Sequence, residues 1–130
     1  LEHGIAQRED YIIPDRDLGS GMIDEDNLLK LPEDMPSAFV CNSDLTASFL
    51  IRKLERNGYR VPDDISVVGF DNFLYPGLCN VGITTYEVDM KEMARRVIHN
   101  ITRKIENPHY KPGVFIVDGS LVCRESVRHV

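Results

Sequence analysis

Two short polar clusters, each directly after an apolar run, carry the side chains best suited to bind a ligand. Residues 42–44 read Asn-Ser-Asp and follow the run 38–41, and residues 71–72 read Asp-Asn and follow the run 65–70. Carboxylate and amide oxygens accept hydrogen bonds from sugar hydroxyls and nucleobase N–H groups, most strongly where little water is present. The candidate binding residues are Asn42, Ser43, Asp44 and Asp71.

Each candidate also has a purely structural interpretation. Asp44 is a good helix N-cap or loop brace, because its carboxylate can accept a hydrogen bond from a free N–H at a helix start. Ser43 could equally serve loop hydrogen bonding or ligand contact. Asp71 is harder to explain as a cap, since Pro76 and Gly77 oppose a regular helix just after it, and a ligand contact is therefore favoured there.

The sequence lacks the patterns of the common enzymatic and metal sites. It contains no G-x-S-x-G elbow and neither of the glycine-rich phosphate-binding motifs. Its histidines lie far apart, and Cys41, Cys79 and Cys123 have no C-x-x-C spacing. We therefore expect a binding protein with no enzyme activity, no metal site and no cofactor. Free thiols favour the reducing cytoplasm.

The elements that must position the two clusters alternate between strand and helix. Apolar runs at 38–41 and 65–70 predict strands buried on both faces, and the spacing of apolar residues predicts helices over 45–57 and 90–105. Alternation implies right-handed crossovers and a parallel sheet flanked by helices, which is an α/β fold. Ligands bind beyond the carboxyl ends of such strands. Further expected elements are a helix tail at 1–5, strands at 11–13, 83–86, 114–117 and 120–122, and a helix at 22–31.

Composition and charge limit the partners. The 130 residues are 42% hydrophobic and 28% charged, as in one globular domain. A net charge of −6 opposes direct binding to nucleic acid, which needs clustered basic residues. No apolar stretch reaches the roughly 20 residues of a membrane span. The start has neither an initiator Met nor a signal-peptide pattern, so we expect a processed chain or part of a longer protein.

From Pro36 onward the sequence resembles the C-terminal half of the regulatory core in the lac and galactose repressor family of bacterial transcription regulators. Residues 38–44 and 58–71 carry the resemblance, residues 121–126 continue it, and residues 1–35 fit loosely. It implies the C-terminal subdomain of a type I periplasmic-binding-protein-like fold. In that family two α/β subdomains close over a small effector, usually a sugar or a nucleobase.

The resemblance also assigns roles to the first polar residues. It implies that Asp71 contacts the effector, and that the position of Ser43, which is often Asn in the family, does so too. Serine shortens the reach and removes an amide donor, which allows an effector different from those of the better-known sugar repressors.

A homodimer is a further implication, formed by the helix 45–57 and the segment 73–78. The apolar side chains of that segment suit either a partner contact or a cover for the sheet edge, and both interpretations stay open. The expected interface residues are Leu45, Phe49, Arg52, Phe73, Leu74, Tyr75 and Leu78. Operator DNA would be bound only through a helix-turn-helix that, like the N-terminal subdomain, lies upstream. Residues 1–130 are thus expected to be a partial effector-binding and dimerisation domain, whose helix 88–106 packs in the absent subdomain.

A periplasmic sugar-binding protein of an ABC transporter is the alternative, since it shares the fold. It would require a signal peptide or lipoprotein start. The stretch 61–71 and the free cysteines favour the regulator.

Overall fold

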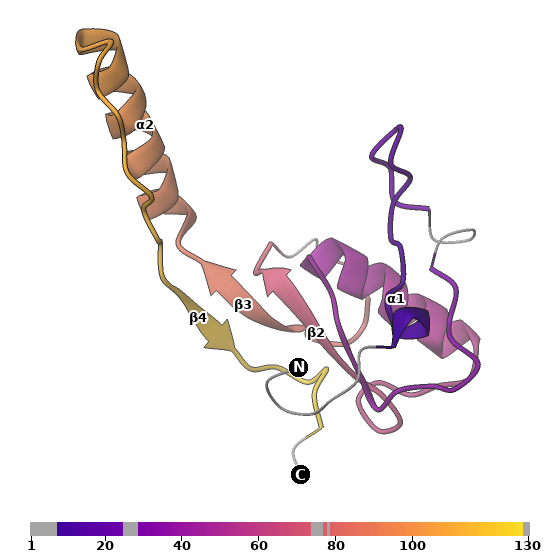
Figure 1. Ribbon diagram of the computed structural model, residues 1–130. Helices are drawn as coiled ribbons and strands as arrows, with labels where there is room; N and C mark the ends of the chain where they lie inside the picture. Colours follow the sequence, from indigo (N-terminus) through magenta and orange to yellow (C-terminus); the bar gives the residue numbers. More distant parts are fainter. Residues whose placement is uncertain (1–7, 25–28, 74–76, 78, 129–130) are drawn as a thin grey trace.

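The computed structural model describes residues 8–24, 29–73, 77 and 79–128. Within these residues a four-stranded sheet carries one helix against it, and a second helix projects away from it (Figure 1). The elements in chain order are the 3-10 helix η1 (Glu9–Tyr11), β1 (Ala38–Val40), α1 (Asp44–Arg56), β2 (Ser66–Asp71), β3 (Thr84–Val88), α2 (Met90–Glu106) and β4 (Gly119–Val122).

The sheet has the order β1-β2-β3-β4, with the first three strands parallel. Phe39 pairs with Val67, and Asp71 pairs with Glu87. The α/β class is therefore confirmed, but the sheet is mixed and not wholly parallel, because β4 runs antiparallel to β3. The reason is the path of the chain: it leaves the sheet after β3, runs out along α2, and returns to the same end of the sheet (Figure 1).

The core lies between α1 and one face of the sheet. Residues 47, 50, 51 and 54 recur at helical spacing and are all buried, as the apolar periodicity predicts. They pack against Phe39 of β1 and Val67 of β2. Burying one such aliphatic side chain stabilises the fold by about 1.5–3 kcal/mol, so this contact holds α1 on the sheet. The helix ends at Asn57, and Gly58 follows with φ of 87°, the left-handed conformation that glycine adopts at helix ends.

The opposite face of the sheet is open. Val40 is 85% exposed, and Phe70 and Leu121 also remain accessible. The rings of Phe70 and Tyr86 stack on this face with centroids 5.9 Å apart. The prediction that strands 38–41 and 65–70 are buried on both faces is thus wrong, because among the described residues α1 covers only one face of the sheet.

Expected elements near the start are absent from the described residues. Residues 11–13 are not a strand: Tyr11 ends η1, and β1 has no strand beyond it in the described part of the sheet. No helix forms at residues 22–24 or 29–31, since a bridge between Arg16 and Ile23 closes a loop there. Residues 25–28 and the expected helix tail at 1–5 lie outside the described residues.

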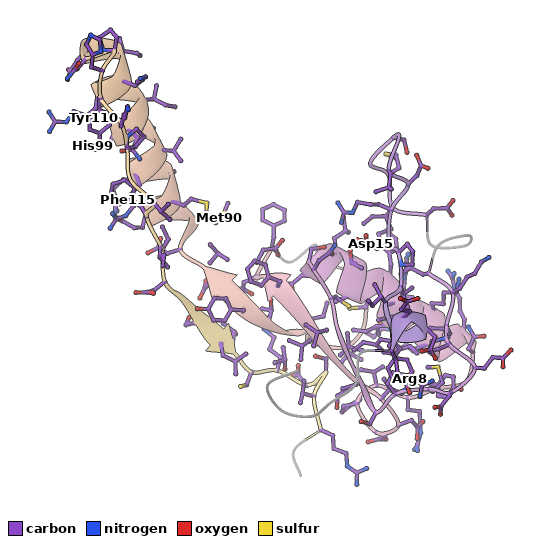
Figure 2. The ribbon with its side chains drawn as sticks, in the orientation of Figure 1. Arg8, Asp15, Met90, His99, Tyr110 and Phe115 are labelled. Carbon is purple, nitrogen blue, oxygen red and sulfur yellow. The ribbon has the colours of Figure 1, made fainter. Side chains whose placement is uncertain are left out.

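α2 is 17 residues long, and each of its residues is at least partly exposed. The segment 107–118, here called the return segment, runs back beside the helix (Figure 2). The Tyr110 hydroxyl donates to Asn100 Oδ1 at 3.3 Å, and the Arg96 guanidinium lies 5.4 Å from the Phe115 ring centroid. Residues 114–117 are therefore not the predicted strand, because they run beside a helix and meet no strand there.

The return segment covers the polar side of α2 and leaves its apolar side open. The apolar stripe of α2 consists of Met90, Met93, Val97, Ile98, Ile101 and Ile105, which are 40–76% exposed. No helix in the described part of the chain is long and apolar enough to cross a membrane.

Candidate functional site

The carboxyl ends of β1 and β2 lie side by side and bring the two polar clusters to one edge of the sheet. Ser43 has an extended backbone and caps α1: its Oγ accepts a hydrogen bond from the Thr46 N–H at 3.2 Å and donates to Thr46 Oγ1 at 3.1 Å. The cap predicted at Asp44 is thus provided by Ser43. Asp44 is the first residue of the helix.

The segment before β1 adds a carboxylate to this edge. Asp15 Oδ2 accepts hydrogen bonds from Thr46 Oγ1 at 2.8 Å, Asn42 Nδ2 at 3.1 Å and Arg16 Nη2 at 2.7 Å. The pKa of Asp15 is lowered to about 2, chiefly by the Arg16 guanidinium, with smaller help from Thr46 and Asn42 and against the effect of burial. Asp15 therefore stays ionised at neutral pH.

Asp15 and Arg16 were missed as site residues, although the sequence carries a signal for them. They follow the apolar run 11–13, just as the two candidate clusters follow theirs. Figure 2 shows Asp15 on the segment that rises past α1. Beside it lies the first hollow, of about 290 Å³, whose lining includes Asp15, Asn42 and Thr46 on the polar side and Ile13 and Phe39 on the apolar side.

Asp44 is buried, with a relative exposure of 2%. Among the described residues neither of its carboxylate oxygens has a hydrogen-bond partner. Its pKa is raised, first by burial and then by the charge of Asp71, while the nearby Thr85 hydroxyl and Arg124 oppose the shift. A Cβ built on Gly69 would lie only 1.9 Å from Asp44 Oδ1, so the absent side chain of Gly69 provides the space for the carboxylate.

Asp71 ends β2 in an unusual backbone conformation. Its φ is 90° and that of Asn72 is 54°, values that residues other than glycine rarely adopt. Asp71 Oδ1 accepts a hydrogen bond from the Phe73 N–H at 2.9 Å. The second hollow, of about 630 Å³, opens here between the end of β2 and the root of α2. Its charged and polar lining includes Asp71, Asn72, Glu87, Asp89, Lys91, Asp118 and Ser120.

The candidate residues thus share one edge but not one hollow. Asn42 lines the first hollow and Asp71 lines the second, while Ser43 and Asp44 line neither of these two. Ser43 is nevertheless partly exposed and accessible to a ligand, whereas Asp44 is buried against Gly69 of β2. Within the described residues no cluster of His, Cys, Asp or Glu side chains could hold a metal ion.

Three of the expected interface residues belong to α1 and lie outside its buried side. Leu45, Phe49 and Arg52 are partly exposed, and the Arg52 guanidinium lies 4.8 Å from the centroid of the Phe49 ring. A groove of about 470 Å³ is lined by α1 on one side and by residues 77, 79 and 80 on the other. Phe73 is 59% exposed. Leu74, Tyr75 and Leu78 lie outside the described residues.

Polar clusters beyond the carboxyl ends of parallel strands occupy the edge at which open α/β sheets commonly bind ligands. The family described as periplasmic binding protein-like domain matches residues 1–127, and the chain belongs to that family. Within it, the chain matches the effector-binding part of lac and galactose repressor-type regulators, as the following relatives show.

The HTH-type transcriptional repressor PurR of Photobacterium profundum is 29% identical over 127 residues, which are 98% of this chain and 38% of the relative. A LacI-type transcription regulator from Bifidobacterium animalis subsp. lactis superposes with a TM-score of 0.65 at 32% identity, over 72% of this chain and 34% of that one. The transcriptional regulator CelR in complex with cellobiose gives 0.63 at 27% identity, over 69% and 28%. The chain thus spans little more than a third of the curated relative.

Proposed function

We propose that the chain senses a small effector for a bacterial transcription regulator of the LacI type, and that the effector binds at the carboxyl ends of β1 and β2. Asp71 and Ser43 would contact it directly. Asn42 would do so from the side of the first hollow, and Asp44 would support the site from beneath. One observation carries the proposal: the parallel pairing of β1 with β2 brings the polar clusters 42–44 and 71–72 beside each other at a single edge of the sheet.

An uncharged polyhydroxy compound or a nucleobase suits these side chains best. Carboxylate and hydroxyl groups accept hydrogen bonds from the O–H and N–H groups of such ligands. The directions of these hydrogen bonds distinguish one ligand from another. The two hollows are lined by more acidic than basic residues, which disfavours an anionic effector. The sugar complex of CelR, a protein similar to this chain, supports the sugar class.

The remaining parts of a regulator would come from the rest of the protein. We propose that operator DNA is bound by a helix-turn-helix outside residues 1–130, because the charge of −6 opposes binding by the chain itself. The apolar stripe of α2 would pack against an N-terminal subdomain, and the outer side of α1 with the segment 73–78 would form a homodimer. A cytoplasmic location follows from this function.

The alternative, a periplasmic sugar-binding protein of a transporter, is less well supported. Relatives that cover almost the whole chain are transcriptional repressors. The same similarity gives no support to an enzymatic role.

The proposal is tested by thermal shift and calorimetry on the full-length protein. The panel contains cellobiose, sucrose, glucose, arabinose, nucleosides and free nucleobases. A compound that binds the native state raises Tm in proportion to the logarithm of its concentration once it is in excess. We expect one class in the panel to do so, and we expect Asp71→Ala to weaken its binding by about tenfold or more.

Asp63→Ala is the matched control, because Asp63 is an exposed carboxylate in the turn before β2. Its affinity should stay within about twofold of the wild type. If no panel compound shifts Tm, or if Asp71→Ala binds as tightly as Asp63→Ala, the proposed site is wrong.

A further inference from the structure

The turn after β2 has positive φ at two consecutive residues. Asp71 and Asn72 both have positive φ, 90° and 54°, and neither is a glycine. Asp and Asn reach positive φ more readily than other non-glycine residues, but two in succession are uncommon, and surrounding contacts stabilise such a pair. The contacts that hold the turn also determine where the Asp71 carboxylate points.

Asn72 provides those contacts through three separate groups. Its backbone N–H donates to Thr85 Oγ1 at 3.4 Å, and its Nδ2 donates to Glu87 Oε1 at 3.1 Å. Both acceptors lie on β3. The third group, Oδ1, accepts a hydrogen bond from Arg124 Nη2 at 2.8 Å, which is the shortest of the three and the one with a charged donor.

Arg124 lies just beyond β4 and is anchored at both ends. Its backbone N–H donates to Thr84 Oγ1 at 2.8 Å, and its carbonyl accepts from the same hydroxyl at 3.0 Å. At the other end, Nη1 donates to the Ile83 carbonyl at 2.7 Å while Nη2 reaches Asn72. The side chain is partly buried, so little water competes for these bonds.

A buried serine fixes the same segment two residues later. Ser126 is 0% exposed, and its Oγ donates to the Val67 carbonyl at 2.6 Å and accepts from the Thr84 N–H at 2.8 Å. The segment 124–126 therefore joins the starts of β2 and β3, and it fixes the backbone from which the Arg124 side chain extends.

We infer that Arg124 is a positioning residue of the effector site: its guanidinium ties the Asn72 side chain to the Ile83 carbonyl, and thereby holds the left-handed turn that aims Asp71. This inference rests on the proposed function, because it gives Arg124 a task in binding without contact to the effector. The Arg124 side chain donates to two acceptors at once, the Ile83 carbonyl and Asn72 Oδ1. A planar guanidinium has paired N–H groups that can do this, whereas the single ammonium of lysine does not match both directions.

The first test needs no ligand. Hydrogen exchange of the Phe73 amide, which bonds to Asp71 Oδ1, reports on the turn, and exchange within α1 reports on the core. In Arg124→Gln we expect exchange at residues 72–73 to rise by about tenfold or more while α1 stays protected. Arg124→Lys keeps the charge and loses the second hydrogen bond, so its exchange rate at residues 72–73 should be intermediate. A graded rise at the turn with α1 protected in both variants shows that the glutamine variant is not simply misfolded.

A double variant identifies the route of the effect. Asn72→Gly removes the Oδ1 acceptor and suits the positive φ, so Arg124→Gln should add no further change at residue 73 in that background. Arg128→Gln is the matched control, since Arg128 is exposed and its guanidinium donates to the backbone carbonyl of Asp63 at 3.4 Å, away from the turn after β2. Exchange at 72–73 in this control should equal the wild type.

The second test uses the panel sugar, nucleoside or nucleobase that stabilises the wild type. Its affinity should fall by about tenfold in Arg124→Gln and by less than about twofold in Arg128→Gln. Unchanged exchange at 72–73 in Arg124→Gln, or an equal rise throughout α1, would overturn the inference. If no panel compound binds, the proposed function fails, and exchange at the turn still decides whether Arg124 holds it.

Discussion

The close approach of Asp44 to Gly69 gives a quantitative prediction. In Gly69→Ala the new Cβ would lie 1.9 Å from Asp44 Oδ1, and the oxygen must retreat by about 1.5 Å to reach the 3.4 Å at which ordinary van der Waals contact begins. The Cβ would also lie 3.0 Å from Ile83 Cγ2, a second contact that is too short. Overpacking of this kind typically costs about 1–3 kcal/mol. We expect a loss in that range, although alanine suits a strand better than glycine does.

Urea unfolding of the full-length protein measures this loss. Gly113→Ala is the control, because nothing lies within 4 Å of a Cβ added there, and its stability should change by less than about 0.5 kcal/mol. Asp44→Ala clears the space, so Gly69→Ala in that background should cost at least about 1 kcal/mol less than it does alone. Equal stability of Gly69→Ala and wild type, or strictly additive losses in the double variant, would refute the placement of the Asp44 carboxylate over Gly69.

Two more predictions concern charge and the open helix face. The folded pKa of Asp15, about 2, lies below its ordinary value of 3.8, so Asp15 adds stability above pH 3.8 that is lost as the pH falls towards 2. Asp15→Asn should therefore cost up to about 2 kcal/mol at pH 7 and almost nothing at pH 2, as urea titrations at several pH values would show; a constant difference would contradict it. Ile101→Ser, in the apolar stripe of α2, should destabilise the full-length protein by about 2 kcal/mol if an N-terminal subdomain covers the stripe. Thr102→Ala, which carries no apolar side chain into that stripe, should change little, and equal stability of the two variants would show that the stripe is not covered.

Local patterns in the sequence predicted the parts of the fold that depend on one element and its neighbour. The spacing of apolar residues in 45–57 correctly predicted α1 and its buried side. The apolar runs before Asn42 and Asp71 predicted β1 and β2 and the polar residues at their ends. Parallel pairing then brought those ends together, as expected. The location of the candidate site was predictable for that reason, because it follows from strand direction alone.

Features that depend on distant parts of the chain were not predictable. Asp15 meets Thr46 across 31 residues, and no local pattern encodes that contact. Residues 11–13 have the composition of a strand, but a strand needs a neighbour with which to pair. Asp44 is a residue type that often caps a helix, yet β2 lies so that Gly69 faces the Asp44 carboxylate, and the carboxylate is buried there.

The second hollow lies where α2 joins the sheet, because residues 88–90 leave β3 there and residues 118–120 return there to β4 (Figure 1). At 1.5 Å per residue, the 17 residues of α2 make a rod about 25 Å long. A pivot of about 10° at its root would swing the far tip by about 4 Å, by the geometry of a rod of that length. The hollow is therefore at the pivot of that rod, where a small change of angle at residues 88–90 gives its largest displacement at the far tip. A spectroscopic label at Glu106 would read that displacement where it is largest, whereas a label at Met90 would barely move.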